Sequence, residues 1–362
     1  MGRTCTMSKY QITLTPVDKF FFGGDMTFQV GTDTEFNEQF SSYIIRSSMF
    51  PQQTSLLGML RFLILRNDSN SFKNGQIANK TEAKKLIGER SFTVNEDHHE
   101  NAFGLIKGIS HVRIRRTLNG EASDLEFAPL MGELAFQGAS YGTYNLADIC
   151  IPALSKQEYD AKKGLSAKLT DGTDLIDLEN VFVEDRRIGI DRNIKTGKVE
   201  ESALFKQISY RFNNEKARYC FVFEATVDDA LNFESYSGQL VSIGGDNSQF
   251  VIGISKAADS KCGITSMNNA ICLLSPTFLT RAEAQTAKFA ITRLIPFRFL
   301  KSEMDKVKSY HILSGNLTRS DRYELYAPGS VFYFENNEQK EAFEGFIKAK
   351  KEFRQIGYNE YK

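Results

Sequence analysis

The sequence predicts an α+β protein built from two split β-α-β units in succession. Its pattern opens with a strand and a helix, continues through several strands, and closes with further strands and a terminal helix, rather than alternating regularly. The length of 362 residues suits two such units. Hydrophobic residues make up 41% and charged residues 25%, which is typical of a soluble globular protein and excludes disorder over most of the chain.

The first unit is expected to begin with a strand, a turn and a buried helix. Polar and apolar residues alternate over residues 10–17, which indicates a half-buried strand. A turn with two adjacent glycines follows at residues 18–25. Residues 56–66 are apolar at nearly every position around a helix, so we expect a buried helix with Thr54 or Ser55 as its N-cap.

Two insertions, a basic strand and a hairpin are predicted next. Residues 67–101 are polar and are expected to form a helix-and-loop insertion, and residues 155–178 a second insertion on the surface. Residues 103–118 mix apolar with basic residues and predict a strand with a basic exposed face. Residues 182–212 predict a β-hairpin that turns at residues 195–198.

The rest of the pattern predicts more strands and a terminal helix. The expected strands lie at residues 221–227, 240–243, 250–254 and 270–275 and on both sides of the Pro-Gly turn within residues 323–335. Residues 339–353 place Phe343, Phe346 and Ile347 along one side of an amphipathic helix.

We expect the chain to divide into an extension, an N-terminal domain and a C-terminal domain, over residues 1–6, 7–230 and 231–362 respectively. Its five cysteines are scattered without a CxxC pair, which favours reduced thiols in the cytoplasm over disulfides or zinc. No run of about 18 apolar residues would span a membrane, and no signal peptide is recognisable.

The four histidines give little support to catalysis or metal binding. His98 and His99 lie together in one acidic, polar loop, whereas zinc ligands usually come from separate elements, so we expect a solvated loop. His111 and His311 lie in no nucleophile signature such as GxSxG. The paired glycines match neither a Walker loop nor GxGxxG. We therefore expect no catalytic residue, no metal and no cofactor.

Charge is balanced over the whole chain but not along it. Lys+Arg and Asp+Glu are both 45, which gives a formal net charge of zero. Basic residues nevertheless exceed acidic ones over residues 107–116, 183–218 and 281–308. Such islands fit phosphate contact along a limited groove, and exposed Phe or Tyr would stack on unpaired bases. The alternative is that these charges are solvated surface and that the aromatic residues form the core.

Five stretches, in order along nearly the whole chain, carry a family resemblance. They are residues 16–24 (PVDKFFFGG), 50–61 (FPQQTSLLGMLR), 186–212 (beginning RRIGI), 238–246 (GQLVSIGGD) and 327–334 (APGSVFYF). Together they resemble the Cas5-like RAMP subunits, conventionally numbered third, of the Cmr complex, the type III-B CRISPR effector. The sequence departs from the family pattern where Gln52 and Gln53 replace a proline-rich entry and where Asp246 replaces a common Glu.

The resemblance implies two ferredoxin-like (RRM-like) RAMP domains with loop insertions and a β-hairpin thumb near residues 186–211. It also implies a non-catalytic scaffold in antiviral defence that grips the 5′ handle of the CRISPR RNA and anchors the large polymerase–cyclase subunit at the base of the complex. The adjacent backbone RAMP subunit would be a second protein partner, and target RNA would be met indirectly.

The expected RNA-binding residues come from the glycine turns, the start of the first helix and the thumb. Helix N-termini favour anions, and arginine can bind phosphate through two hydrogen bonds. The thumb tip would insert between the handle and the first guide bases. The full set is Lys19, Gly23, Gly24, Gln52, Gln53, Thr54, Ser55, Arg61, Arg186, Arg187, Ile190, Arg192, Asn193, Lys195, Thr196, Lys198, Arg211, Gly244 and Gly245.

Two other function classes are weighed against this one. RAMP proteins that process CRISPR RNA are metal-independent endonucleases, which usually need a histidine near the 2′-hydroxyl, commonly on the first helix. Neither that helix nor the thumb contains one here. A module that binds only proteins would copurify without RNA.

Overall fold

The structure is a computed structural model that describes residues 6–24, 26–33, 38–130, 166–192, 199–244, 246–257, 269–304 and 318–362. The strands of these residues form mostly antiparallel sheets with few helices, so the predicted α+β class is confirmed. No helix in this part of the chain is long and apolar enough to cross a membrane.

The first unit has the ferredoxin-like strand order. Its elements are β1 (Met7–Pro16), α1 (Gln53–Arg66), β7 (Arg113–Leu118), β13 (Arg218–Asp228), the short 3-10 helix η1 (Phe233–Tyr236) and β15 (Ser248–Lys256). β1 lies between β15 and β13, β7 lies beyond β13, and every pair is antiparallel. This is the arrangement of a split β-α-β unit whose second helix is reduced to η1.

Further strands and helices extend this unit. The edges of its sheet are continued by β14 (Leu240–Ile243) on one side and by β8 (Glu121–Phe127), β9 (Lys168–Thr170) and β10 (Leu175–Asp177) on the other. The predicted insertion after α1 contains β4 (Phe72–Lys73), β5 (Gln76–Ile77) and α2 (Lys80–Ile87). A single turn, α4 (Leu178–Val181), leads into the hairpin.

The second unit repeats the same order in smaller form. Its elements are β16 (Ala270–Cys272), α5 (Arg281–Ala284), β17 (Phe289–Ile291), β22 (Val331–Tyr333), α6 (Asn337–Ala349) and α7 (Lys351–Gln355). β22 lies between β16 and β17. The N–H groups of Cys272 and Lys362 each donate to the other residue's carbonyl over 3.0 Å, so the end of the chain takes the place of the fourth strand.

Each unit carries a hairpin between its second and third strands. In the first it is β11 (Phe182–Arg192) with β12 (Val199–Phe212), which confirms the predicted hairpin. In the second it is β18 (Leu294–Phe297) and β19 (Leu300–Lys301) with β20 (Thr318–Arg319) and β21 (Tyr323–Tyr326).

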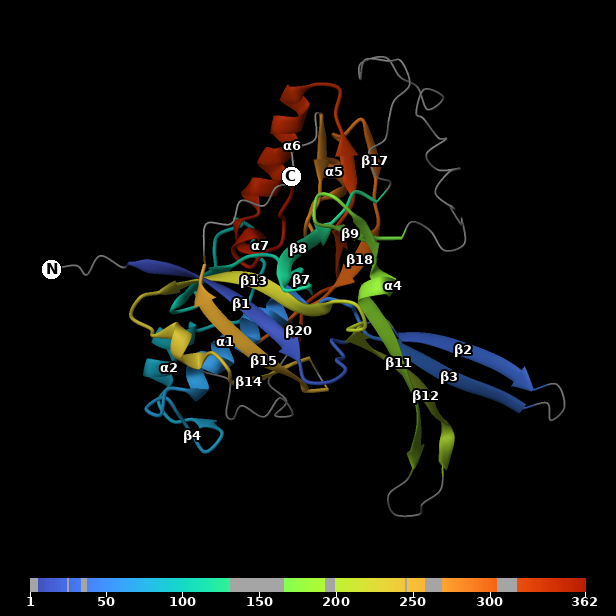
Figure 1. Cartoon of the computed structure of the whole chain (residues 1–362), viewed down its shortest axis with the longest axis horizontal. Helices are drawn as coiled ribbons and strands as arrows, with labels where there is room; N and C mark the ends of the chain where they lie inside the picture. Colours follow the sequence, from blue (N-terminus) through green and yellow to red (C-terminus); the bar gives the residue numbers. More distant parts are fainter. Residues whose placement is uncertain are drawn as a thin grey trace.

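A third hairpin, β2 (Met26–Asp33) with β3 (Glu38–Arg46), does not appear in the sequence prediction. β3 pairs in parallel with β12, which joins the two hairpins of the first unit into one four-stranded sheet. Both hairpins project away from the body of the molecule (Figure 1). We call this four-stranded sheet the joined hairpins.

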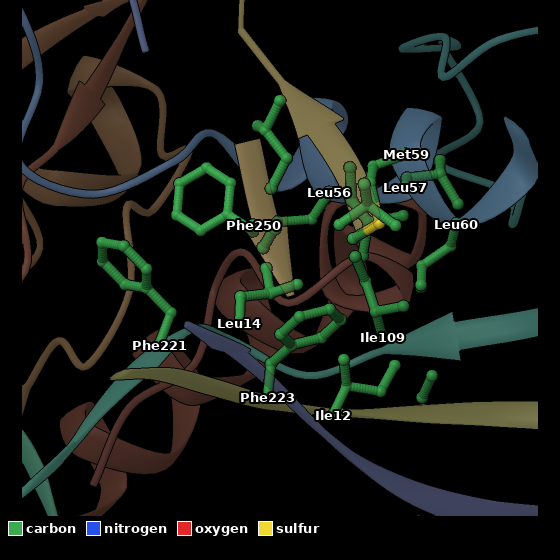
Figure 2. Packing of buried hydrophobic residues seen from close by; sticks show 14 of the residues in the cluster. Ile12, Leu14, Leu56, Leu57, Met59, Leu60, Ile109, Phe221, Phe223 and Phe250 are labelled. Atoms are coloured by element: carbon green, nitrogen blue, oxygen red, sulfur yellow. The ribbon is translucent and has the colours of Figure 1, made fainter. Parts of the chain in front are cut away.

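The main core lies between α1 and the first sheet. Ile12 and Leu14 alternate with half-buried polar residues along β1, while Leu56, Leu60 and Leu63 recur on one side of α1, and all five are inaccessible to solvent. Figure 2 shows Ile12, Leu14, Leu56 and Leu60 packed together with Phe223 and Phe250. A second core of Ile271, Leu273, Leu279, Phe332, Phe334, Phe343 and Ile347 lies under α6.

The strand pairing bears on the division into domains. β15 pairs with β1 along its length, so the sheet of the first unit includes residues as late as Lys256. The boundary at residues 230 and 231 remains a prediction, and this pairing favours a later one.

Two local predictions are wrong. The N-cap of α1 is Gln52, which makes no side-chain capping bond, so the helix starts before Thr54. Residues 103–118 do not form one strand but two, β6 (Ile106–Ile109) and β7, which both pair with β13. The ladder is interrupted at Ser110, whose hydroxyl accepts from the N–H of Glu224 and whose carbonyl accepts from Gln53.

The predicted basic exposed face of residues 103–118 is also wrong, because its cations are engaged within the chain. Arg113 is only 7% exposed and lies 3.4 Å from Asp124, which also accepts from Arg115 over 2.6 Å. Arg116 pairs with Asp171. These charges stabilise the sheet and its edge instead of forming a free phosphate-binding surface.

Candidate nucleic-acid interface

The glycine turn after β1 lies at the base of the joined hairpins. The N–H of Phe20 donates to the carbonyl of Tyr210 over 2.7 Å, and the N–H of Tyr210 donates back over 3.0 Å. On the other hairpin, Ser47 accepts from the N–H of Phe22 over 2.9 Å, and the N–H of Ser48 donates to the carbonyl of Gly23 over 2.7 Å. The turn therefore connects β3 and β12 to the main sheet.

Two glycines are required there by close backbone contact. A Cβ atom on Gly24 would lie 1.8 Å from the carbonyl oxygen of Arg46. Gly244 has a φ of +83°, and a Cβ atom on it would lie 2.4 Å from the carbonyl oxygen of Phe21. The structure thus brings both glycine turns predicted from the sequence to the base of the hairpins.

The joined hairpins have two chemically different faces, because successive residues of a strand point to opposite sides. The register places Glu184 opposite Tyr210, Arg186 opposite Ile208, and Ile208 opposite Arg46. We call this side, with Arg46, Glu184, Arg186, Ile188, Lys206, Ile208 and Tyr210, the Glu184 face. The other side, with Asp185, Arg187, Gly189, Phe205, Gln207, Ser209 and Arg211, is the Asp185 face. Arg186 and Arg187, predicted as a pair, therefore lie on different faces.

On the Glu184 face, one carboxylate holds two arginines. Glu184 accepts from Arg46 and, over 2.9 Å, from the Nε of Arg186. The hydroxyl of Tyr210 lies 3.1 Å from Arg46, and this hydrogen bond raises the pKa of Arg46. Burial alone would raise the pKa of Glu184, but the hydrogen bond from Arg186 and the charge of Arg46 lower it below its usual value. Sequence reasoning missed Arg46, since the hairpin that carries it was not predicted.

On the Asp185 face, one carboxylate again lies near two cations. Asp185 accepts from Lys19 over 2.7 Å and lies 3.8 Å from the Nε of Arg187. The amide of Gln207 donates to Asp246, which extends this face toward the main sheet. The ring of Phe205 lies over Gly189, where a Cβ atom would be 2.1 Å from the ring.

The predicted residues on α1 lie elsewhere and have partners within the chain. Gln53 is buried and donates to the carbonyl of Ser110 over 2.8 Å. The phenol of Tyr358 is buried beside the first turn of α1. Burial raises the pKa of Tyr358, and the adjacent backbone of Gln53 and Thr54 partly offsets the rise. The C-terminal segment therefore covers part of the helix N-terminus that was expected to meet phosphate.

Arg61 is engaged in packing α1 against α2. Its Nε donates over 2.6 Å to the carbonyl of Ile87, at the end of α2. Burial lowers the pKa of Arg61 to about 10. Its guanidinium thus satisfies a helix end that would otherwise lack a hydrogen-bond partner.

The remaining predicted residues are only partly described. Ile190 and Arg192 belong to β11 by their backbone. Arg211 is exposed on β12, opposite Val183. Five predicted residues lie outside the described part of the chain: Asn193, Lys195, Thr196, Lys198 and Gly245.

The prediction of a solvated loop is wrong for His98. Its Nδ1 lies 2.7 Å from a carboxylate oxygen of Glu352, a fully buried residue of α7. Lys350 lies 3.2 Å from its Nε2 and pairs with Glu283 over 2.9 Å. A buried carboxylate needs such partners, which explains why the loop packs against the C-terminal helices. Within the described ranges, no group of three or more His, Cys, Asp or Glu residues is arranged to hold a metal ion.

Wherever the structure describes the burial of a Phe or Tyr side chain, that side chain is buried or half-buried. The side chains of Phe28, Phe40 and Tyr43 on β2 and β3 lie outside that description, so exposed aromatic residues stay a prediction for this hairpin. At the base of the hairpins, Phe20, Phe182, Phe212 and Phe221 pack together, with neighbouring ring centroids 5.0–6.4 Å apart. These aromatic rings therefore pack under the base of the hairpins, and among the side chains whose exposure the structure describes, the large apolar ones that are exposed are not aromatic.

Comparison with known proteins gives one family match. A family model described as CRISPR-associated protein (Cas_Cmr3) matches residues 157–361. No curated protein matches the sequence.

Chains in three solved structures are similar at low identity. One, in the cryo-EM structure of the type III-B Cmr-beta bound to cognate target RNA and AMPPnP (state 1), is 15% identical with a TM-score of 0.49; the match covers 97% of this chain and 95% of that chain. A chain in the structure bound to cognate target RNA is 16% identical with a TM-score of 0.48, and the match covers 97% of this chain and 96% of that chain. A chain in the cryo-EM structure of the apo state is 12% identical with a TM-score of 0.26, and the match covers 70% of this chain and 98% of that chain. At such values these structures assign no residue a role in this chain.

Proposed function

The chain belongs to the Cas_Cmr3 family of CRISPR-associated proteins, and from this premise we propose that it is an RNA-binding subunit of a type III-B Cmr complex. The family model covers more than half of the chain, including β12, β13 and the whole second unit. The proposal takes the bound RNA to be the CRISPR RNA and its contacted part to be the 5′ handle. The large polymerase–cyclase subunit and the adjacent backbone subunit are the proposed protein partners.

The observation that supports RNA binding most strongly is the convergence of basic residues on the joined hairpins. Arg186 and Arg187 of β11, Arg46 of β3 and Lys19 after β1 come together from distant parts of the sequence. The carboxylates that hold these residues and the neighbouring Gln207 are those of Glu184, Asp185 and Asp246. Several exposed arginines on a projecting sheet suit the phosphates of a short single strand.

We propose that the subunit is not a catalyst. The described histidines lie away from the joined hairpins: His98 is bound to Glu352, and His111 lies 3.7 Å from Glu126 on β8. An endonuclease that cleaves without metal would need a general base within reach of a bound 2′-hydroxyl. Incubation of the purified chain with precursor CRISPR RNA should leave the RNA intact; specific cleavage would contradict this part of the proposal.

The proposal is tested by binding of handle RNA to a variant in which Arg186, Arg187 and Arg192 are replaced by alanine. We expect weaker binding and a salt dependence of log K that is less steep by about 2, because each lost phosphate contact removes about 0.7 from the slope on single strands. Fluorescence anisotropy across a salt series measures both quantities. Unchanged affinity at physiological salt, with the variant still folded, would contradict the placement of RNA on the thumb.

A further inference from the structure

We infer that single-stranded RNA lies across the Glu184 face, with backbone phosphates at Arg46 and Arg186 and a base against Ile188. This rests on the proposed function and adds three elements to it: the face of the hairpin that is used, a contributing arginine from the β2–β3 hairpin, and an aliphatic contact to a base.

The register aligns the two arginines across three strands. Arg186 on β11 is opposite Ile208 on β12, which is opposite Arg46 on β3. Strands are spaced about 4.8 Å apart, so the two arginine Cα atoms are about 10 Å apart, with the buried Ile208 between them. Both side chains converge on the carboxylate of Glu184. Two arginines from separate hairpins are thereby held close together before any ligand arrives.

Their hydrogen bonds leave donors and charge for a ligand. Arg186 uses its Nε and Nη2 on Glu184, over 2.9 and 2.8 Å, while Arg46 meets Glu184 and Tyr210 through Nη1. Each guanidinium carries five N–H groups, so several on each remain to meet phosphate oxygens. Two positive charges share one negative charge, and the arginine side chains are 52% and 61% exposed. The positive charge that remains on the two arginines, and their exposure, make them able to bind a phosphodiester group.

An apolar residue stands beside this pair. Ile188 lies two residues beyond Arg186 on the same face and is 72% exposed, more than any other large apolar side chain whose exposure the structure describes. Its cross-strand neighbour is Lys206, which is opposite Ile44. Aliphatic side chains can pack against or between bases. An exposed aliphatic side chain thus lies beside the two arginines, as a base lies beside its phosphates along a single strand.

The Asp185 face is less suited to this role. Lys19 is only 18% exposed and is bound to Asp185, and Gln207 is bound to Asp246. Arg187 is as exposed as Arg186, at 64%, but Asp185 is shared between it and Lys19. Arg211 is also exposed on this side, but it lies opposite Val183, two positions from Asp185. This side therefore shows no two arginines held by one carboxylate, whereas Glu184 holds both Arg46 and Arg186.

The test compares single variants of the full-length chain in binding a fluorescein-labelled, mixed-sequence single-stranded RNA over a salt series. Arg46→Gln and Arg186→Gln should each weaken binding about tenfold and lower the salt slope by about 0.7. Arg187→Gln should cause a clearly smaller loss, although it removes the same charge from the adjacent residue. Arg322→Gln, at an exposed position in the second unit, controls for net charge.

Two substitutions that leave the net charge unchanged test the position of Arg46 and the contact of a base with Ile188. Tyr210→Phe keeps the ring in its packing but removes the hydroxyl next to Arg46. It should weaken binding roughly threefold without changing the salt slope, because the number of cations is the same. Ile188→Ala should likewise reduce affinity at unchanged slope, whereas Leu300→Ala, an exposed aliphatic change in the second unit, should not.

The outcomes separate this inference from the proposed function. If the wild-type chain binds RNA, but Arg187→Gln weakens binding as much as Arg186→Gln or Arg46→Gln has no effect, the assignment to the Glu184 face is overturned and the proposed function stands. If the wild-type chain binds double-stranded RNA or an acidic protein in preference to single-stranded RNA, or binds no RNA at low salt, both are overturned.

Discussion

At the residue scale, glycines at the base of the hairpins are fixed by neighbouring backbone. Gly24 faces the carbonyl of Arg46, and Gly244 faces the carbonyl of Phe21. Backbone atoms cannot move aside as a flexible side chain can, so these positions exclude any side chain. The sequence showed that both turns contain glycine, but only the structure shows what each glycine faces.

Gly24→Ala should therefore destabilise the protein. With the added methyl group 1.8 Å from the carbonyl oxygen of Arg46, the turn and the base of β3 must separate, and we expect a cost of about 2 kcal/mol or more. Urea denaturation followed by circular dichroism measures the change.

The matched control is Gly345→Ala. Gly345 lies within α6 with nothing near its added Cβ, so this variant should be more stable by about 0.5–1 kcal/mol. Equal effects of the two substitutions would contradict the close approach at Gly24.

At the scale of elements, the strands and helices with clear periodicity could be predicted and their pairing could not. The alternation along β1 and the apolar helix α1 are local patterns, and both were predicted nearly in full. The parallel contact of β3 with β12 joins residues about 160 positions apart and has no local signature. For the same reason the sequence predicts an exposed basic face for β7, since its acidic partner Asp124 is recognisable only after β7 and β8 are paired.

The same limit applies to the candidate site. The sequence predicted the hairpin, its arginines and both glycine turns, and the structure brings these together. It could not separate Arg186 from Arg187 by face without the strand register, and it could not find Arg46 without the second hairpin. Conversely, Arg61 and Gln53 looked available in the sequence, but each is engaged in packing α1 against the rest of the fold.

The ion pair that ties the β9–β10 turn to β7 predicts a pH dependence. Asp171 accepts from Thr173 over 2.6 Å and from Arg116 over 2.6 Å. The hydrogen bond from Thr173 is the main reason that the pKa of Asp171 falls to about 2 from 3.8, and Arg116 adds to the effect. Because the pKa is lower in the folded state, this stabilisation is fully present above pH 3.8 and is lost as pH falls toward 2.

Asp171→Asn should therefore be less stable than the wild type at pH 7, and the difference in urea midpoint should narrow as pH is lowered from about 5 toward 3. Midpoints measured along this series check the prediction. A difference that stays constant over the range would show that the ionised carboxylate contributes nothing.

At the scale of the whole molecule, the main core includes side chains from both units. Phe353 of α7 contacts Phe92 from the insertion after α1, at a centroid distance of 5.5 Å, and stacks on Phe278 at 5.0 Å. Phe297 and Tyr358 complete this cluster, which is continuous with the core under α1. The two ferredoxin-like units should therefore unfold together.

Phe353→Ala tests this coupling. Loss of a fully buried ring should cost about 3–5 kcal/mol and lower the melting temperature of a single calorimetric transition. Phe346→Ala, on the half-buried side of α6, should cost less. Two transitions, of which only one shifts in Phe353→Ala, would contradict a shared core.

The central claim is that RNA binds this subunit on the joined hairpins, and cross-linking tests it most directly. The full chain would be purified from cells with whatever nucleic acid it retains, irradiated with ultraviolet light, and digested so that peptides carrying a nucleotide can be identified by mass spectrometry. We predict nucleotide-bearing peptides from residues 38–48 and 182–212, the two segments that form the Glu184 face. Cross-links confined to the second unit, or a chain that retains no RNA, would contradict the account.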